Sequence, residues 1–255
     1  MKITRSIAPN LFTLVNLFMG FSSIIAISNG EILRGAILII IGGLFDVIDG
    51  VTARLIKASS QLGIELDSLC DLITFGAAPS YMLYRTYFFQ LNEIGILLAS
   101  LPVLSGAIRL ARFNTQVSNF EDKKFFRGLP IPASAFTIIS YLAFIYNKQY
   151  LGVEIEQLLI YFITIISSSA MISDIKYENI PRYSLKYIKQ FPVKFSIFNI
   201  AIILCIITSG IALFPFMLFY IIFGAVRHFI FWLLWKPEAA DDVDESDLEE
   251  PGPFN

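Results

Sequence analysis

The sequence has few of the residues that build soluble domains, redox centres or zinc sites. Only 16% of its 255 residues are charged and 56% are hydrophobic, and the mean hydropathy is +0.68. This composition excludes an ordinary soluble globular domain and predicts a membrane protein. The two cysteines, Cys70 and Cys205, fall in separate apolar stretches, and His228 is the one histidine. Disulfides, redox chemistry and a zinc site are therefore not expected.

Strand patterns, internal repeats and base-reading motifs are also missing, which disfavours a role in nucleic-acid binding. The sequence offers instead about eight apolar runs near the length of roughly 20 residues that a spanning helix needs. The runs lie near residues 10–28, 32–56, 64–89, 94–113, 130–147, 156–172, 194–213 and 215–235. We therefore predict an all-α fold, a polytopic integral membrane helical bundle with about eight transmembrane helices.

Turn and charge signals organise these runs. Pro9-Asn10 is expected to start the first run, Asn29-Gly30 to form a tight turn, and Pro215 to separate the last two runs. Lys and Arg concentrate in alternate connections, so the positive-inside rule predicts that both termini are cytoplasmic. No small-residue cleavage site follows the first run, which favours an uncleaved helix over a signal peptide. In a cell without organelles, the location would be the cytoplasmic (inner) membrane.

The chain is expected to divide into two parts. Residues 1–237 hold the apolar runs and would form one membrane-embedded domain. Residues 238–255 are acidic and contain Pro251 and Pro253. Such a segment cannot bury enough apolar surface to fold, so we predict a disordered cytoplasmic tail.

Four aspartates interrupt the apolar sequence near the connection between the second and third predicted helices. Ionisable residues in such segments are costly, which makes them functional candidates. Helical periodicity places them on two facing stripes with small residues that let a backbone or a bulky ligand approach. The stripes are Asp46, Asp49, Gly50 and Ala53 on one helix and Gly63, Asp67 and Asp71 on the next. Carboxylates suit Mg²⁺ or Mn²⁺, so the pattern predicts a cage for two divalent ions whose coordination a ligand pyrophosphate could complete.

Ion pairing and cation transport are alternative roles for the four aspartates. Ion pairs with Arg54 and Lys57 would neutralise only some of the four charges and give no reason for the small residues. A cation transport path would favour acids spread across the membrane, whereas these acids converge at one end of one hairpin. Both roles are therefore less favoured than a metal-dependent enzyme.

The stretch from Asp46 to Asp71 matches, at every defined position, the pattern D-x2-D-G-x2-A-R-x8-G-x3-D-x3-D. It thereby resembles the signature of the CDP-alcohol phosphatidyltransferase family. Further motifs, over roughly the first half of the chain, resemble the membrane-embedded phosphatidylserine synthases of bacteria and archaea. They are Pro9-Asn10 with Thr13, Asn16 and Gly20, then Phe75 to Pro79, Arg109 to Asn114 and Gly128 to Ala133.

The resemblance implies a reaction in which the hydroxyl of L-serine attacks the phosphorus of CDP-diacylglycerol, so that CMP leaves and phosphatidylserine forms. It also implies a homodimer and two divalent ions held by Asp46, Asp49, Asp67 and Asp71, with Asp71 also acting as the general base. Contacts with CDP-diacylglycerol are expected at Gly50, Ala53, Arg54, Ser60 and Gly63. Thr13 and Asn16 would line the same pocket or simply form hydrogen bonds between helices.

The residues that bind the acceptor are a separate question. Arg suits bidentate capture of a carboxylate or phosphate, so we expect the serine carboxylate or the lipid phosphate to be held by Arg109, Arg112, Asn114 and Arg127. Within the same family, glycerol 3-phosphate or inositol phosphate is the alternative acceptor, and it would demand more cationic contacts. A lipid substrate of ether type also stays open.

Overall fold

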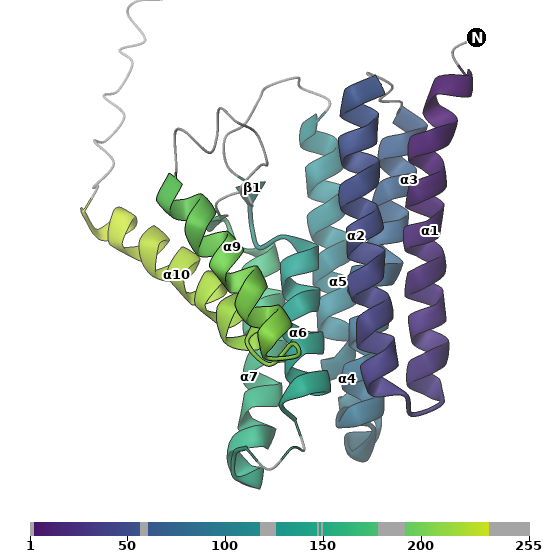
Figure 1. The fold of residues 1–255 in the computed structure, drawn as a ribbon. Helices are drawn as coiled ribbons and strands as arrows, with labels where there is room; N and C mark the ends of the chain where they lie inside the picture. The colour runs from purple at the N-terminus through teal and green to yellow at the C-terminus, as the bar shows by residue number, and fades with distance from the viewer. Residues whose placement is uncertain are drawn as a thin grey trace, which may run out of the picture.

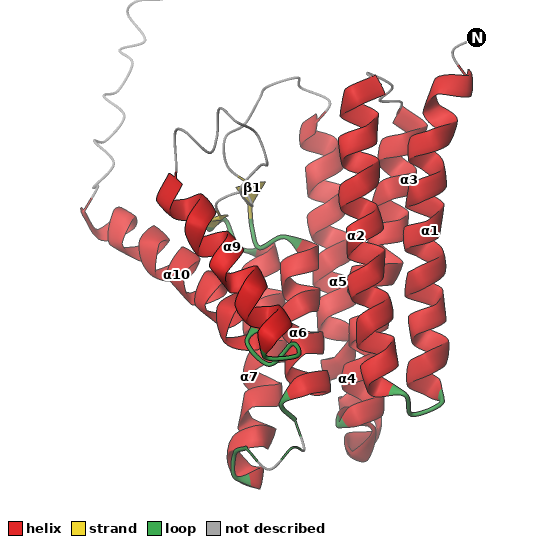
Figure 2. Cartoon of the chain, in the orientation of Figure 1, coloured by secondary structure: helices red, strands yellow, loops and turns green. Residues whose placement is uncertain are grey.

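The computed structural model describes residues 3–56, 61–117, 126–146, 148, 150–177 and 192–234, and these residues are almost entirely helical (Figures 1 and 2). Within them, four helical stretches are long and apolar enough to cross a membrane. They are Asn10–Ser28, Phe88–Thr115, Val153–Ile172 and Leu213–Phe231. The chain is therefore a helical integral membrane protein, as predicted. The predicted acidic tail lies outside the described residues.

The first two helices form a long antiparallel hairpin, α1 (Ile3–Ser28) and α2 (Ile32–Ile56), which Figure 1 shows side by side. The predicted turn between them is confirmed. Gly30 has φ +84°, a conformation that glycine adopts without a steric penalty. The following residue, Glu31, donates its backbone N–H to the carbonyl oxygen of Ala26 at 2.9 Å, which closes the end of α1.

The third predicted helix is divided in the structure. It consists of α3 (Gln61–Asp71), a π-helical turn η1 (Leu72–Ala77) and α4 (Ala78–Thr86). A π turn adds a residue to the helical repeat, so residues before and after it face different neighbours than in a regular helix. The hydropathy of the sequence does not reveal such a turn, because its residues are as apolar as those around it.

The helix α5 (Asn92–Val117) follows a short 3-10 turn, η2 (Phe88–Leu91). Pro102 lies inside α5, where a proline interrupts the helical hydrogen bonds. The next backbone N–H, that of Val103, donates to Ser80 Oγ at 3.1 Å. This contact joins α5 to α4 at the point where the proline weakens the ladder.

The next two helices, α6 (Ile131–Phe144) and α7 (Val153–Ile172), are flanked by two very short strands. The strands β1 (Phe126–Arg127) and β2 (Lys176–Tyr177) pair antiparallel. No strand was predicted, because a two-residue segment is too short to produce an alternating pattern. The pairing connects the start of α6 to the chain that follows α7.

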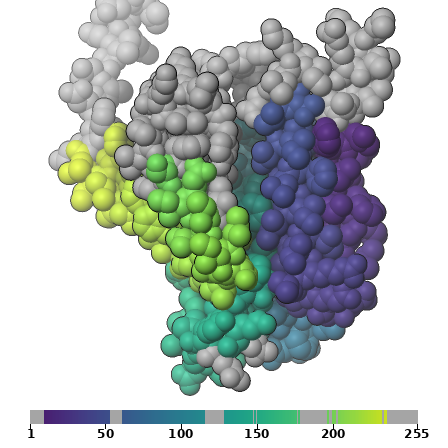
Figure 3. Space-filling view, viewed as in Figure 1, coloured from purple at the N-terminus to yellow at the C-terminus, as the bar shows by residue number. Residues whose placement is uncertain are grey.

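The last two described helices, α9 (Pro192–Ile207) and α10 (Leu213–Leu234), form a hairpin that leans away from α1 to α5 in Figure 1. The space-filling view shows this hairpin along one side of the molecule and α1 with α2 along the other (Figure 3). Tyr177 of β2 is buried against α10, where its hydroxyl donates to the carbonyl oxygen of Ile221 at 3.4 Å. Burial raises the pKa of Tyr177 to about 12, so the phenol remains a neutral donor at physiological pH.

Two predicted helix starts were misplaced. The helix α1 begins at Ile3, ahead of Pro9, and α10 begins at Leu213, with Pro215 in its first turn. Pro215 is the third residue of α10, where backbone N–H groups have no intrahelical partner, so proline is tolerated there. Pro9 is the seventh residue of α1, beyond those positions, and removes one intrahelical hydrogen bond. A proline early in a helix therefore does not fix the first helical residue.

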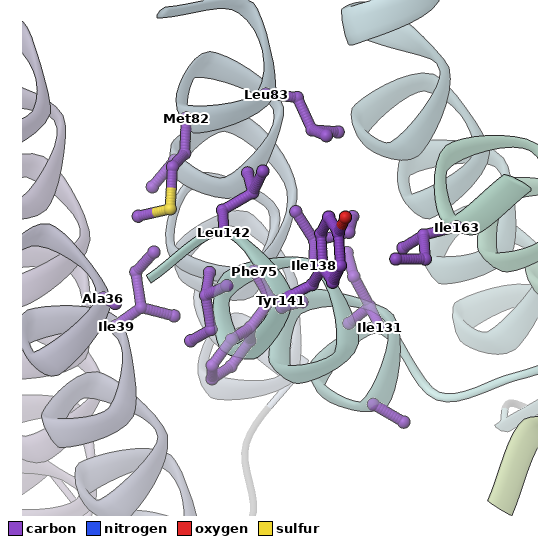
Figure 4. Close-up of a cluster of buried hydrophobic side chains, with 14 of the residues drawn as sticks. Ala36, Ile39, Phe75, Met82, Leu83, Ile131, Ile138, Tyr141, Leu142 and Ile163 are labelled. Carbon is purple, nitrogen blue, oxygen red and sulfur yellow. The ribbon is translucent and has the colours of Figure 1, made fainter. Parts of the chain in front are cut away.

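The apolar core lies around α6. Its buried side chains come from α1, α2, η1, α4, η2, α5, α6, α7, β2 and α10, and Figure 4 shows part of this cluster. The labelled members are Ala36, Ile39, Phe75, Met82, Leu83, Ile131, Ile138, Tyr141, Leu142 and Ile163. Large apolar side chains are also exposed on the outside of the bundle, for example Phe18 at 62% and Ile206 at 73%. A lipid-facing surface accounts for that exposure.

Candidate functional site

Three of the predicted aspartates form a compact cluster between α2 and α3. One carboxylate oxygen from each of Asp46, Asp49 and Asp67 lies within 4.8 Å of the others. Asp49 is only 5% exposed, although like charges this close repel one another strongly when they are removed from water. Such an arrangement calls for a counter-charge.

The three carboxylates suit a divalent metal ion. Carboxylate oxygens are hard ligands of the kind that Mg²⁺ and Mn²⁺ prefer. In the described part of the chain, Asp67 Oδ1 is buried and has no hydrogen-bond partner. A buried acceptor of this kind is costly unless something binds it. The three aspartates can therefore hold a metal ion.

The fourth aspartate, Asp71, lies next to this cluster, at the end of α3. Its side chain is 9% exposed and within electrostatic range of Asp46, Asp49 and Asp67. Asn16 of α1 donates from Nδ2 to Asp71 Oδ1 at 3.1 Å. The structure thus brings all four predicted acids together, three as a ring of close oxygens and the fourth beside it.

A second α1 residue, Thr13, contacts the cluster directly. Its hydroxyl donates to Asp49 Oδ2 at 2.8 Å, and both side chains are buried. Thr13 and Asn16 are three residues apart and so share one face of α1. The hydrogen-bonding role between helices, one of the two predicted for these residues, is therefore the one observed. A role in the substrate pocket stays a prediction.

The two arginines at the end of α5 have different surroundings. Arg109 is half-buried and within electrostatic range of Asp71, and within the described residues its Nε is buried without a hydrogen-bond partner. Arg112 is exposed, and its Nη1 donates to the carbonyl oxygen of Ile172 at 2.7 Å. That carbonyl belongs to the last turn of α7, where a cation complements the helix dipole. Arg112 thus has a structural contact that the sequence did not reveal.

Asn114 connects α5 to α3. Its Nδ2 donates to Glu65 Oε2 and to Ser68 Oγ, at 3.1 Å each, and Ser68 Oγ lies 3.2 Å from Asn114 Oδ1. Ser68 follows Asp67 directly in the chain, so these bonds help to fix the part of α3 that carries the cluster. Sequence analysis missed Glu65 and Ser68, whose only signal was their position beside Asp67.

The structure describes the surroundings of only some of the remaining predicted substrate contacts. Gly50 lies on α2 beside the cluster, and a Cβ added there would meet nothing within 4 Å, which leaves room for a ligand. Gly63 lies half-buried on α3. The helical positions of Ala53 and Arg54 in α2 and the place of Arg127 in β1 are described, but their side chains are not, and Ser60 lies outside the described residues.

Together, the fold and the site define a helical membrane protein with a buried carboxylate centre suited to a divalent cation. Residues 6–172 match the sequence profile of the CDP-alcohol phosphatidyltransferase family. The matched region contains the whole aspartate cluster, most of α1 and all of α2 to α7. The chain therefore belongs to this family.

Curated relatives have similar lengths and related names. A protein from Helicobacter pylori named CDP-diacylglycerol--serine O-phosphatidyltransferase is 35% identical over 219 residues, which is 86% of this chain and 90% of the relative. One of the same name from Methanocaldococcus jannaschii is 35% identical over 218 residues, 85% of this chain and 91% of the relative. The archaetidylserine synthase of Methanothermobacter thermautotrophicus is 37% identical over 182 residues, 70% of this chain and 73% of the relative. The chain is thus similar to named serine transferases along most of its length.

Proposed function

We propose that this protein transfers the phosphatidyl group of CDP-diacylglycerol to L-serine, giving phosphatidylserine and CMP. The observation that carries the proposal is the ring formed by Asp46, Asp49 and Asp67 with Asp71 beside it. The names of the relatives support serine as the acceptor. Two divalent ions, Mg²⁺ or Mn²⁺, held by the four carboxylates would polarise the phosphoryl oxygens and stabilise the charge on the leaving CMP.

In the proposed reaction, Asp71 accepts the proton of the serine hydroxyl while the hydroxyl oxygen forms a bond to the lipid-side phosphorus. The phosphoanhydride bond to CMP breaks, and CMP leaves with the bonding electrons. An aspartate has a reference pKa near 3.9 and is a weak base. Its action therefore depends on positioning and on proton transfer that accompanies bond formation. The hydrogen bond from Asn16 supplies part of that positioning.

The CDP group is proposed to lie along α2 and α3, against the four acids. The open space beside Gly50 supports this placement. Thr13 and Asn16 would border the pocket from α1. The other proposed contacts are Ala53, Arg54, Ser60 and Gly63.

Among the candidates for the acceptor site, the contacts favour Arg109. Its buried Nε and its proximity to Asp71 suit an anion held next to the base. Arg112 and Asn114 already have protein partners, the carbonyl oxygen of Ile172 and the side chains of Glu65 and Ser68. For these two residues and Arg127, binding of the serine carboxylate or lipid phosphate remains part of the proposal.

The proposal extends to the setting of the enzyme. We place it in the cytoplasmic membrane as a homodimer of chains with about eight transmembrane helices, both termini and the active site on the cytoplasmic side, and a tail from residue 238. The end of α2, the start of α3 and the start of α1 lie at one end of the bundle in Figure 1, which supports a single polar face. Light scattering in detergent tests the dimer. Maleimide labelling of cysteines introduced at each end of the bundle tests the orientation.

The acceptor is tested with labelled L-serine and CDP-diacylglycerol, and the radioactivity in the extracted lipid is counted. Incorporation of the label that excess glycerol 3-phosphate or inositol phosphate does not reduce supports the proposal. No incorporation of serine, together with CMP release when a phosphorylated acceptor is supplied, keeps the family and replaces the substrate. The name of the Methanothermobacter relative favours one second candidate, an ether lipid donor. The same assay with CDP-archaeol in place of CDP-diacylglycerol distinguishes the two.

A further inference from the structure

The π turn η1 begins directly after Asp71, at Leu72. Thr74 lies within this turn and is fully buried, with 0% of its surface exposed. Its hydroxyl donates to the backbone carbonyl oxygen of Asn16, on α1, at 3.0 Å. This hydroxyl therefore forms its hydrogen bond with another helix, whereas a buried helical threonine usually bonds within its own helix.

Two glycines accommodate Thr74 from α1 and α2. A Cβ at Gly20 would overlap the Thr74 hydroxyl and lie 2.8 Å from the Thr74 Cα. A Cβ at Gly42 would lie 2.8 Å from Thr74 Cγ2 and 3.0 Å from Asn16 Oδ1. Larger residues at either position would push Thr74 or Asn16 out of place. The helices α1 and α2 thus form a notch that fits this side chain closely.

Asn16 connects this notch to the active site. Its carbonyl oxygen accepts the bond from Thr74, and its side-chain amide donates the bond to Asp71. Asn16 is itself fully buried, with 0% exposed. One α1 residue therefore holds the chain on both sides of the point where α3 becomes a π turn. Neither contact requires a substrate.

We propose that Thr74 and Asn16 are positioning residues that fix the Asp71 carboxylate in its reactive orientation, with the π turn placing Thr74 in the notch. The proposal rests on the function proposed above, in which Asp71 is the base. Thr74 acts through Asn16 and through the backbone of η1. Asn16 acts by direct contact with Asp71.

The expected effect follows from geometry. A displacement of about 1 Å in a reacting group can cost on the order of 100-fold in rate. Loss of the Thr74 hydroxyl would loosen Asp71 while leaving the substrate contacts on α2 in place. We therefore expect kcat to fall and KM to stay nearly constant. A threonine with only a structural role would change stability and leave kcat unchanged.

The test compares Thr74→Val, which keeps the shape and removes the hydroxyl, with Thr74→Ser, which restores the hydroxyl. The matched control is Thr164→Val in α7, because Thr164 is also fully buried and its hydroxyl donates to a carbonyl oxygen of its own helix, that of Ile160, at 2.7 Å. CMP release from CDP-diacylglycerol and serine is measured for each purified protein. For Thr74→Val we expect kcat to fall by roughly 10- to 100-fold with KM within about twofold. Thr74→Ser should recover most of the loss, and Thr164→Val should match the wild type.

Two further measurements separate positioning from misfolding. Thermal unfolding and elution from a sizing column report whether Thr74→Val is folded, and Thr74→Ala, which places no apolar group against the Asn16 carbonyl, is the second variant. Mn²⁺ binding without substrates, followed by electron paramagnetic resonance, should weaken in Thr74→Val and Thr74→Ala and not in Thr74→Ser or Thr164→Val. In addition, Asn16→Ala with Thr74→Val should lose little more activity than Asn16→Ala alone, because the two residues act as a unit.

The outcomes are distinct. Wild-type protein that releases no CMP contradicts the proposed function itself. An active wild type together with folded Thr74→Val or Thr74→Ala that keeps its kcat overturns the positioning role alone. An equal loss of kcat in Thr164→Val overturns it as well, since that result would reflect a general effect of removing buried hydroxyls.

Discussion

Asn16 and Asp71 are 55 residues apart in the sequence, and the Asn16 amide donates a hydrogen bond to the Asp71 carboxylate at 3.1 Å. The bond joins the first helix to the end of α3, so α1 borders the aspartate cluster in addition to the α2–α3 hairpin. Thr13 makes the corresponding bond to Asp49 one turn earlier on α1. Polar groups of α1 therefore hold one carboxylate on each of the two facing helices.

Asp71→Asn is expected to reduce turnover by at least about 100-fold, in line with the usual contribution of a positioned acid or base. The amide keeps the size of the side chain and cannot accept the proton of the serine hydroxyl. CMP release measures the loss, and the thermal unfolding midpoint shows whether the fold is kept. Retained activity in a well-folded variant would contradict the assignment of Asp71 as the base.

Thr13→Val is expected to lower kcat/KM by roughly tenfold or more, because a hydrogen bond to a charged group contributes about 1.5–3 kcal/mol. Thr13→Ser keeps the donor and serves as the control. Steady-state kinetics at several Mn²⁺ concentrations measures the effect. A valine variant with the activity of the serine variant would show that the bond to Asp49 does not support function.

Arg109→Lys and Arg112→Lys are expected to differ in their effect on the KM for serine. Lysine keeps the charge and loses the planar fork that binds an anion through two hydrogen bonds. Arg109→Lys should raise the KM for serine by about tenfold, the equivalent of roughly 1.4 kcal/mol. Arg112→Lys should raise that KM less than Arg109→Lys does, because part of the Arg112 guanidinium is already bonded to the Ile172 carbonyl. Equal KM values for the wild type and the Arg109 variant would remove Arg109 from the acceptor site.

Gly128→Ala is expected to lower the free energy of unfolding by about 1–3 kcal/mol, the usual range for a residue forced into a strained backbone conformation. Gly128 has φ +80°, and an added Cβ would overlap the carbonyl oxygen of Met171. Gly152→Ala is the control, since a Cβ there meets nothing within 4 Å. Thermal unfolding in detergent compares the two. Equal midpoints would contradict the close approach of Gly128 to the Met171 carbonyl near the end of α7.

The helices and the acids were predictable because both depend on local sequence. Apolar runs of bilayer length identify membrane helices, and the spacing of Asp46, Asp49, Asp67 and Asp71 places them on two helical faces. The convergence of these acids followed from the short connection between two adjacent helices. Each of these inferences uses only neighbouring residues.

Contacts between distant segments were not predictable in the same way. The π turn that carries Thr74 is as apolar as a regular helix, and its bond to the Asn16 carbonyl depends on how α1 packs. Arg112 was predicted as an anion ligand from its type and position, and that role stays a prediction, but nothing in the sequence indicated its hydrogen bond to a carbonyl on α7. Residue type alone does not reveal which backbone carbonyl a side chain will meet.

The most direct test of the central claim is metal-dependent CMP release by purified protein with CDP-diacylglycerol and serine. The account predicts release with Mg²⁺ or Mn²⁺, none with EDTA, and recovery when the metal is restored. It also predicts that Asp67→Ala abolishes the recovery, because Asp67 supplies a buried oxygen to the carboxylate ring. Release that persists in EDTA, or in folded Asp67→Ala, would contradict the claim that this ring is the catalytic metal site.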